Sequence, residues 1–136
     1  MEFFLNSKTA GERTRLLAAF EQFARANHLS DAVRKSADLA IEEAVTNVLS
    51  YAFTDQEAHT IALKFAVNGS EFIIEISDDG RAFDPTKFPP PNLKTPATTR
   101  EVGGLGIHMI RQSMDAIDYE RVDGRNVLRM RKQLKG

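Results

Sequence analysis

Hydrophobic and polar positions along the chain follow two periods, one typical of helices and one typical of strands. The apolar run Phe3-Phe4-Leu5 predicts a first strand. Thr9, with Glu12 three residues later, predicts a capping box at the start of a helix. The apolar face of that helix is expected to consist of Leu16, Phe20 and Phe23.

A second helix is expected to begin after Ser30. Serine is a preferred N-cap residue, and the carboxylate of Asp31 favours the positive end of a helix dipole. The helix is predicted to extend to about Tyr51 and to lie against a sheet, because apolar residues recur on one face at Ala37, Ile41, Ala44 and Val48.

From Thr60 the apolar residues recur at every second position, which predicts strands. Two such series, Ile61–Val67 and Phe72–Ile76, are separated by Asn68-Gly69, a pair typical of a tight hairpin turn. The two strands are therefore expected to pair in antiparallel fashion.

The last third of the chain is expected to contain one more helix and one more hairpin. The helix is predicted from near Gly104 to about Met114. The hairpin is predicted to join Ile117–Val122 to Val127–Arg131 through Asp123-Gly124.

Residues 84–102 lack apolar periodicity and contain all five prolines of the chain. Structureless loops longer than about 12 to 15 residues are uncommon in a compact domain unless they act as lids or are disordered. A tolerated surface insertion is the alternative. The position of this loop between two glycine-containing motifs favours a lid.

Composition narrows the class of protein. A chain of 136 residues fits one domain, 1–136, and a net charge of −1 gives no reason to expect nucleic acid or an anionic membrane as a partner. The absence of cysteine excludes disulfides and thiolate metal ligands and agrees with a reducing compartment. Because residues 1–10 lack a leader pattern and no apolar stretch is long enough to span a bilayer, we expect a cytoplasmic protein.

Glu43 and Asn47 lie four residues apart and are expected to project side by side from the second helix. A carboxylate beside an amide oxygen can hold Mg²⁺, and the carboxylate can alternatively accept a proton from a hydroxyl nucleophile. A solvated helix face is the plainer interpretation of the pair. Glu42 points elsewhere and is expected to be a surface charge.

Two further motifs suggest a nucleotide site. Asp78 ends an apolar strand and is followed by Gly80, so a carboxylate can accept a hydrogen bond from the amine of adenine where the backbone allows close approach. A simple turn is the alternative. Gly103, Gly104 and Gly106 open a helix, where uncovered N–H groups can bind phosphate. A flexible linker is the alternative there.

In this order the three motifs resemble the GHKL ATPase superfamily, and within it the small anti-sigma-factor serine kinases of the RsbW type. The N box, Glu-Ala-x-x-Asn, matches Glu43–Asn47. The G1 box, Asp-x-Gly-x-Gly/Ala-Phe, matches Asp78–Phe83, and the G2 box matches Gly104–Gly106. Tyr51–Phe53 and Gly124–Val127 also resemble family patterns, so the likeness covers nearly the whole chain.

The resemblance implies a Bergerat fold, which is the fold of histidine-kinase-like ATPases. This is an α+β two-layer sandwich with a mixed, mainly antiparallel sheet, helices on one face, and ATP held between a helix and the lid. Glu43 would be the general base that deprotonates a serine, and Asn47 would hold the magnesium ion. The cofactors would be ATP and Mg²⁺, bound by Asn47, Asp78, Gly80, Phe83, Arg100, Gly103, Gly104, Leu105 and Gly106.

Two positions depart from the family pattern. Ala82 stands for the second G1 glycine, a substitution that the small kinases tolerate. Val102 stands where some members carry an arginine. The candidates for positive charge at the terminal phosphate are then Arg100, Lys94 and Lys87.

The resemblance favours an ATP-dependent anti-sigma factor and protein-serine/threonine kinase that phosphorylates a STAS-type anti-anti-sigma partner and sequesters a sigma factor. The family tendency adds a homodimer. The alternative is a nucleotide-gated binding module with little or no kinase activity. A third, weaker option is an ATP-binding domain detached from a larger histidine kinase. Glu43 favours the kinase, because a module that only binds needs no proton acceptor there.

Overall fold

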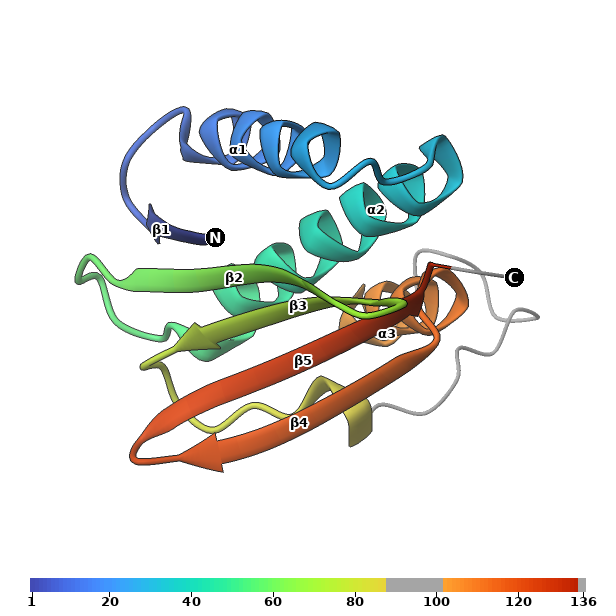
Figure 1. Ribbon diagram of the computed structural model, residues 1–136. Coiled ribbons are helices and arrows are strands. Elements are labelled where there is room, and N and C mark those ends of the chain that lie inside the picture. Colours follow the sequence, from blue (N-terminus) through green and yellow to red (C-terminus); the bar gives the residue numbers. More distant parts are fainter. Residues whose placement is uncertain (88–101, 135–136) are drawn as a thin grey trace.

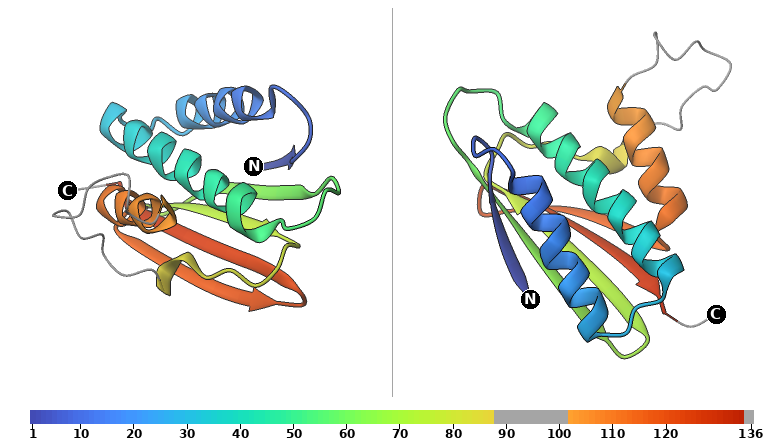
Figure 2. Two further views of the ribbon diagram at one scale, coloured as in Figure 1. Left: turned by 180° about the vertical axis from the view of Figure 1, so that it is seen from behind. Right: turned by 90° about the horizontal axis from the view of Figure 1, so that it is seen from above.

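The computed structural model describes residues 1–87 and 102–134, without the side chains of 102–106. Within these residues five strands form one sheet, and three α-helices cover one of its faces (Figures 1 and 2). The strands are β1 (Glu2–Asn6), β2 (Thr60–Asn68), β3 (Glu71–Asp78), β4 (Ala116–Val122) and β5 (Arg125–Gln133). The helices are α1 (Glu12–Ala26), α2 (Asp31–Asn47) and α3 (Val102–Ser113), with a π-helical turn η1 (Val48–Ala52) and a 3₁₀ turn η2 (Pro85–Lys87). The predicted two-layer α+β arrangement is confirmed.

The strands are arranged in the order β1-β2-β3-β5-β4. The family resemblance implies a mixed, mainly antiparallel sheet, and the pairings between the described strands are all antiparallel. This order places β3 and β5 side by side at the centre of the sheet, although β5 is the last strand in the sequence. The end of β3 at Asp78 thereby lies beside the start of β5 at Asn126.

The two hairpin turns differ in how they fit the prediction. Asp123 (φ 50°) and Gly124 (φ 76°) connect β4 to β5 as predicted, and two positive φ values are typical of a type I′ turn. In the first hairpin Asn68 pairs with Glu71, so the turn is Gly69-Ser70, one residue later than predicted. Gly69 (φ 65°) occupies the first central position, where a type II′ turn favours glycine.

The start of α1 corrects the predicted capping box. Gly11 is the N-cap residue and Thr9 does not cap the helix. Glu12 instead reaches back to the end of β1, where its carboxylate accepts a hydrogen bond from the backbone N–H of Asn6 at 2.9 Å and pairs with Arg15. The carboxylate therefore fastens the helix to the strand before it.

The start of α2 confirms the prediction, because the hydroxyl of Ser30 accepts a hydrogen bond from the N–H of Val33 at 3.2 Å. The predicted continuation to Tyr51 changes character after Asn47, where the α-helix gives way to η1. π-Helical turns are rare and are frequently found at functional sites. Here the turn directs the end of the helix toward the loop after β3.

The core lies between the helices and the sheet. The rings of Phe20 and Phe23 on α1 pack against Phe65 on β2 and Phe72 on β3, with ring centroids 5.3 to 5.9 Å apart. Phe20, Phe65 and Phe72 are fully buried. Alternate residues of β2 and β3 face these rings, which explains the period of two in the sequence.

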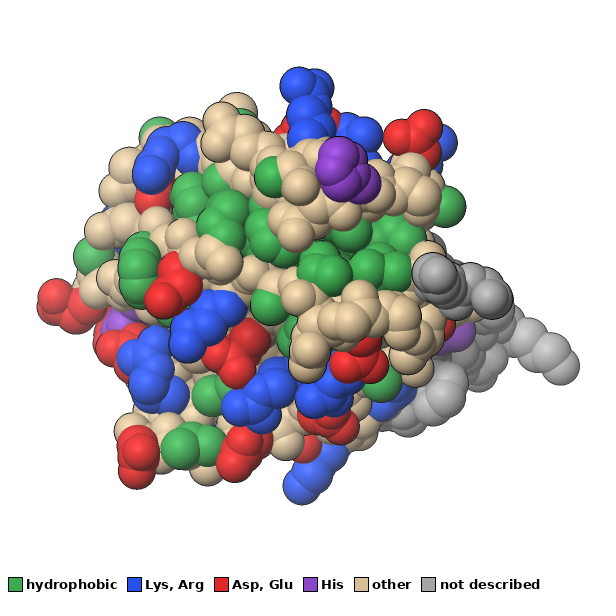
Figure 3. All heavy atoms as spheres, viewed as in Figure 1, with side chains coloured by type: hydrophobic (Ala, Val, Ile, Leu, Met, Phe, Trp, Pro, Cys, Tyr) green, Lys and Arg blue, Asp and Glu red, His purple; other side chains and the backbone are tan. Residues whose placement is uncertain are grey.

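The opposite face of the sheet is covered by charged side chains of both signs (Figure 3). Glu75 on β3 pairs with Arg129 on β5 at 2.9 Å, and Arg129 also pairs with Glu120 on β4 at 3.1 Å. These cross-strand pairs belong to a solvent-facing surface, as expected for a sheet with helices on one side only. In the described part of the chain, the helices are too short or too polar to cross a membrane.

Candidate nucleotide-binding site

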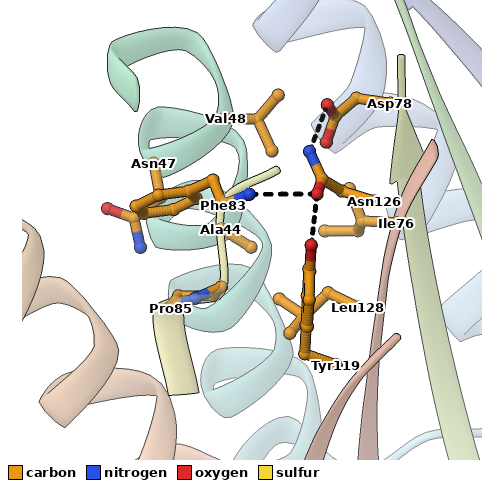
Figure 4. A pocket seen from close by; sticks show the side chains of 10 residues that line it. All are labelled: Ala44, Asn47, Val48, Ile76, Asp78, Phe83, Pro85, Tyr119, Asn126 and Leu128. Carbon is orange, nitrogen blue, oxygen red and sulfur yellow. Dashed lines mark hydrogen bonds between the residues drawn. The ribbon is translucent and has the colours of Figure 1, made fainter. Parts of the chain in front are cut away.

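A pocket lies between the C-terminal end of α2 and the sheet (Figure 4). Helix α2 and η1 supply one wall, and β3, β4 and β5 supply the other. The cavity volume is about 20 Å³, which is room for one water molecule, so a purine ring can enter only if the pocket widens. The lining residues are Ala44, Asn47, Val48, Ile76, Asp78, Phe83, Pro85, Tyr119, Asn126 and Leu128.

Asp78 is the acidic residue of this pocket, and its side chain is buried at the end of β3. Its Oδ1 accepts hydrogen bonds from the N–H of Gly80 at 2.8 Å and from Nδ2 of Asn126 at 2.9 Å. Burial raises the pKa of Asp78, and these two hydrogen bonds to the ionised form oppose that rise. The carboxylate is thus held in place by donors although it lies in an apolar setting.

Gly80 is required by the packing of its own backbone. A Cβ atom there would lie 2.4 Å from the carbonyl oxygen of Ala52 in η1, which is too close for any side chain. The next residue fixes the same contact, since the N–H of Arg81 donates to that carbonyl at 2.9 Å and Nε of Arg81 donates to the carbonyl of Tyr51 at 2.6 Å. The sequence suggests that Gly80 lets a base approach; the structure adds this second reason for glycine.

Phe83 completes the loop after β3. Its ring stacks on Tyr51 with centroids 5.1 Å apart and planes inclined by 16°. Pro85 follows it into the pocket wall, where Asp84 accepts a hydrogen bond from the N–H of Thr86 at 2.9 Å. The loop therefore folds back across the end of α2 and closes one side of the pocket.

Asn126 on β5 is a functional candidate that the sequence motifs do not indicate. It is buried opposite Asp78 in the strand register and hydrogen-bonds to the carboxylate of that residue. A signal existed in the sequence, because Leu128 and Met130 mark the inward positions of β5 and the same period of two places Asn126 on that face. A polar residue at an inward position calls for a partner.

Asn47 carries an unsatisfied buried group. The residue is 4% exposed, and its Nδ2 is the one buried side-chain polar atom of the described residues without a hydrogen-bond partner. Such groups are rare and need an explanation, because leaving one buried costs about 1 to 3 kcal/mol. A phosphate oxygen would satisfy the N–H, and the amide oxygen would be available to a magnesium ion. The residue therefore fits the bound group that the sequence predicts.

The two neighbouring glutamates of α2 differ in their surroundings. Glu42 pairs with Arg13 on α1 at 3.2 Å, so it is the surface charge that the sequence predicts. Glu43 is partly exposed and forms no hydrogen bond or ion pair with another described residue. Its carboxylate is not used to hold the fold. Among the described residues no group of three or more His, Asp or Glu side chains could by itself hold a metal ion.

The glycine motif lies in α3, which begins at Val102 rather than near Gly104. Gly103, Gly104 and Leu105 are therefore in the first turn, where the N–H groups have no partner within the helix, and Gly106 follows directly. Arg100 and Lys94 lie outside the described residues, as does most of the predicted lid 84–102. Lys87 is described and is exposed at the end of η2.

A second polar cluster, also not indicated by the sequence motifs, adjoins the pocket at Asp79. Nδ1 of His59 lies 3.0 Å from Asp79, and its Nε2 lies 2.7 Å from Asp55. The imidazole stacks on Phe53 with centroids 4.2 Å apart. The hydrogen bond to Asp55 raises the pKa of His59, and the one to Asp79 adds to the rise. This cluster fastens the segment after η1 to the residue beside Asp78.

Comparisons with known proteins agree with this geometry. A family model described as a histidine kinase-like ATPase domain matches residues 6–132. The chain is 34% identical over 122 residues to the serine/threonine-protein kinase BtrW of Bordetella bronchiseptica, which covers 90% of this chain and 86% of that protein. It is 27% identical over 94 residues to the serine-protein kinase RsbW of Listeria monocytogenes, covering 66% and 60%. It is 26% identical over 130 residues to the anti-sigma F factor of a Thermoanaerobacter species, covering 94% and 87%.

Solved structures show the same fold at low sequence identity. The crystal structure of the RsbU and RsbW domains of a Mycobacterium tuberculosis protein aligns with a TM-score of 0.67 at 12% identity, over 98% of this chain and 31% of that one. The Acinetobacter baumannii histidine kinase AdeS aligns with a TM-score of 0.55 at 15% identity, over 100% and 68%. The sequence relatives confirm the resemblance to RsbW-type proteins, and the chain belongs to the histidine kinase-like ATPase domain family.

Proposed function

We propose that this pocket binds Mg-ATP and that the chain is a protein-serine kinase. The observation that carries the proposal is the unpaired Nδ2 of Asn47, buried in a pocket whose opposite wall holds the carboxylate of Asp78. The wall that holds Asn47 thus offers groups to the triphosphate and its metal ion. The wall that holds Asp78 offers a hydrogen-bond acceptor to the adenine base. Membership in an ATPase family and relatives named as serine kinases support the same function.

Each binding residue has a distinct role in the proposal. Asp78 accepts a hydrogen bond from the exocyclic amine of adenine, and Phe83 and Leu128 provide apolar walls. The free N–H groups of the first turn of α3 bind phosphate oxygens. Asn47 supplies one ligand to a magnesium ion that otherwise keeps water and phosphate ligands, as is usual for this ion. When bound, ATP would supply the phosphoryl group and Mg²⁺ would neutralise part of the phosphate charge.

Glu43 is the catalytic residue of the proposal. It lies one helical turn before Asn47 on α2, and its carboxylate is not engaged by another described residue. A carboxylate in this position can orient the hydroxyl of a substrate serine and take its proton. Positioned general bases contribute about 10² to 10⁴ in rate. The remainder of the catalysis is positioning and charge stabilisation, as in other phosphoryl transfers.

The protein partners are inferred from the relatives. The Thermoanaerobacter relative is named as an anti-sigma F factor. We extend that role to this chain, which would bind a sigma factor in one state and phosphorylate a STAS-type anti-anti-sigma protein in the other. The alternative is a binding module in which ATP sets the shape of a surface and phosphotransfer is slow or absent.

Substitution of Glu43 tests the proposal against this alternative. Glu43→Gln should reduce phosphotransfer from labelled ATP to a STAS partner by about 10² or more while calorimetric ATP affinity stays within about twofold. Glu42→Gln is the matched control, because it removes the neighbouring carboxylate and should leave transfer unchanged.

Two other outcomes would decide differently. If the wild-type chain binds ATP and retains a sigma factor but never transfers phosphate, the binding module is correct. If calorimetry shows no ATP binding at millimolar concentration with Mg²⁺ present, the nucleotide site itself is wrong.

A further inference from the structure

The amide of Asn126 uses its full hydrogen-bonding capacity inside the protein. Its Nδ2 donates to Oδ1 of Asp78 at 2.9 Å and to the carbonyl of Arg81 at 2.8 Å. Its Oδ1 accepts from the N–H of Phe83 at 3.1 Å, from Nη1 of Arg121 at 3.1 Å, and from the hydroxyl of Tyr119. An amide has two N–H donors and one oxygen, so no polar group of Asn126 is left for a ligand.

The chemistry of these partners fixes the orientation of the amide. The nitrogen faces two acceptors, a carboxylate and a carbonyl, and the oxygen faces three donors. A flipped amide would place its nitrogen against a backbone N–H and a guanidinium group, neither of which can accept a hydrogen bond. The network itself therefore determines which atom is nitrogen and which is oxygen.

The network joins three parts of the site that are distant in sequence. Asn126 connects the end of β3, the loop of residues 80–83, and β4 through Tyr119. Arg121 strengthens the same junction, because its Nη1 also donates to the carbonyl of Gly80 at 2.8 Å. The amide is buried, so these bonds form in a setting where each is worth more than at the surface.

We propose that Asn126 is a positioning residue for base recognition, and this rests on the proposed ATP site. By binding Oδ1 of Asp78 together with the N–H of Gly80, it fixes the plane of the carboxylate. Oδ2 of Asp78, which accepts no hydrogen bond from another described residue, is then presented to the exocyclic amine of the base. Preorganisation of this kind improves affinity by removing the ordering cost on binding.

The test compares ATP with inosine triphosphate, whose base lacks the exocyclic amine. In the wild-type chain ATP should bind at least about tenfold more tightly. Asn126→Ala should weaken ATP binding at least about tenfold and inosine triphosphate binding less than about threefold, so the preference for ATP is lost. In phosphotransfer assays the KM for ATP should rise while kcat at saturating ATP stays within about twofold.

Two further variants separate positioning from folding. Met130→Ala removes another buried side chain from the same face of β5, and it should lower stability without changing the ratio of the two affinities. Arg121→Gln alters an exposed residue that contacts the network, and it should lower the ratio of ATP affinity to inosine triphosphate affinity about threefold. This variant tests the proposal even if Asn126→Ala fails to fold.

The proposal would be overturned by an unchanged ratio in Arg121→Gln or by equal losses of both affinities in a folded Asn126→Ala. Those results would leave the ATP site standing. A wild-type chain that binds neither nucleotide would instead reject the proposed function itself.

Discussion

The space between the helices and the sheet is filled in two different ways at its two ends. Beneath α1, four phenylalanine rings pack together without a polar group among them. Beneath the end of α2, the small side chain of Ala44 leaves room for three polar residues that are all buried, Asn47, Asp78 and Asn126. The end beneath α1 stabilises the fold by removing apolar surface from water. The end beneath α2 instead buries polar groups, and one of them has no hydrogen-bond partner. If the proposed site binds ATP, stability and ligand recognition belong to separate ends of this space.

The largest expected effect is at the aromatic end. Phe20→Ala removes a fully buried ring and should lower the free energy of unfolding by about 4 kcal/mol. ATP affinity of the folded fraction should stay within about twofold, because the ring does not line the pocket. Urea unfolding and calorimetry would measure the two quantities. A larger loss of ATP affinity would show that the two ends are coupled.

Gly80→Ala should have a slightly smaller effect on stability but a direct effect on the site. The new methyl group would lie 2.4 Å from the carbonyl oxygen of Ala52, and relieving this contact should cost about 3 kcal/mol. ATP binding should weaken as well, since η1 and the loop after β3 must separate. Gly69→Ala is the control: it has open space around it and only backbone strain, about 1 kcal/mol, and should leave ATP binding intact.

Asn47→Leu should stabilise the ligand-free chain, whereas most substitutions of buried residues destabilise a protein. Removing the unpaired amide should raise the free energy of unfolding of the ligand-free chain by about 1 kcal/mol. The same change should abolish the additional stabilisation that Mg-ATP gives the wild-type chain. Thermal unfolding with and without Mg-ATP measures both effects. A ligand-free variant less stable than the wild type would mean that the amide has a structural partner.

The smallest expected effect is a pH dependence at the cluster of Asp55, His59 and Asp79. Because Asp55 and Asp79 raise the pKa of His59 above its ordinary value of 6.5, the cluster stabilises the fold fully below about pH 6.5 and loses this contribution as the pH rises through the raised value. The pKa of Asp55 is lowered mainly by its hydrogen bond to His59, and the positive charge of Lys8 adds a smaller lowering.

His59→Gln should therefore flatten the change in unfolding free energy between about pH 6 and about pH 8. Unfolding by urea at the two pH values measures it. An unchanged slope in the variant would show that other groups titrate in this range.

Local patterns were sufficient for much of the fold. The strands, Ser30 as a cap and the Asp123-Gly124 turn each depend on neighbours in the sequence, and they are confirmed. The box at Thr9 failed because the side chain of Glu12 is used by β1 instead of by the helix end. Its partner Asn6 precedes the predicted box and could not be recognised from helix signals alone.

Sequence patterns could locate a candidate site residue only where its own local motif marks it. Asp78 has the burial and the position at a strand end that its motif suggests. Asn126 was missed because its partner Asp78 is 48 residues away and the pairing of β3 with β5 creates the contact. His59 was missed for the same reason, since Asp79 is 20 residues from it and becomes its neighbour only in the folded chain. The roles of Asp78, Asn47, Glu43 and the glycines in α3 all stay predictions.

The π-helical turn η1 sets the register between the two nucleotide motifs on either side of it. The carbonyls of Tyr51 and Ala52 both face Arg81, so the end of the helix and the loop after β3 are joined at two successive peptide groups. Deleting a single residue from Val48–Ala52 would rotate the remainder of the turn around the helix axis and point both carbonyls away from Arg81. Evolution of this chain can therefore vary the side chains of η1 far more freely than its length.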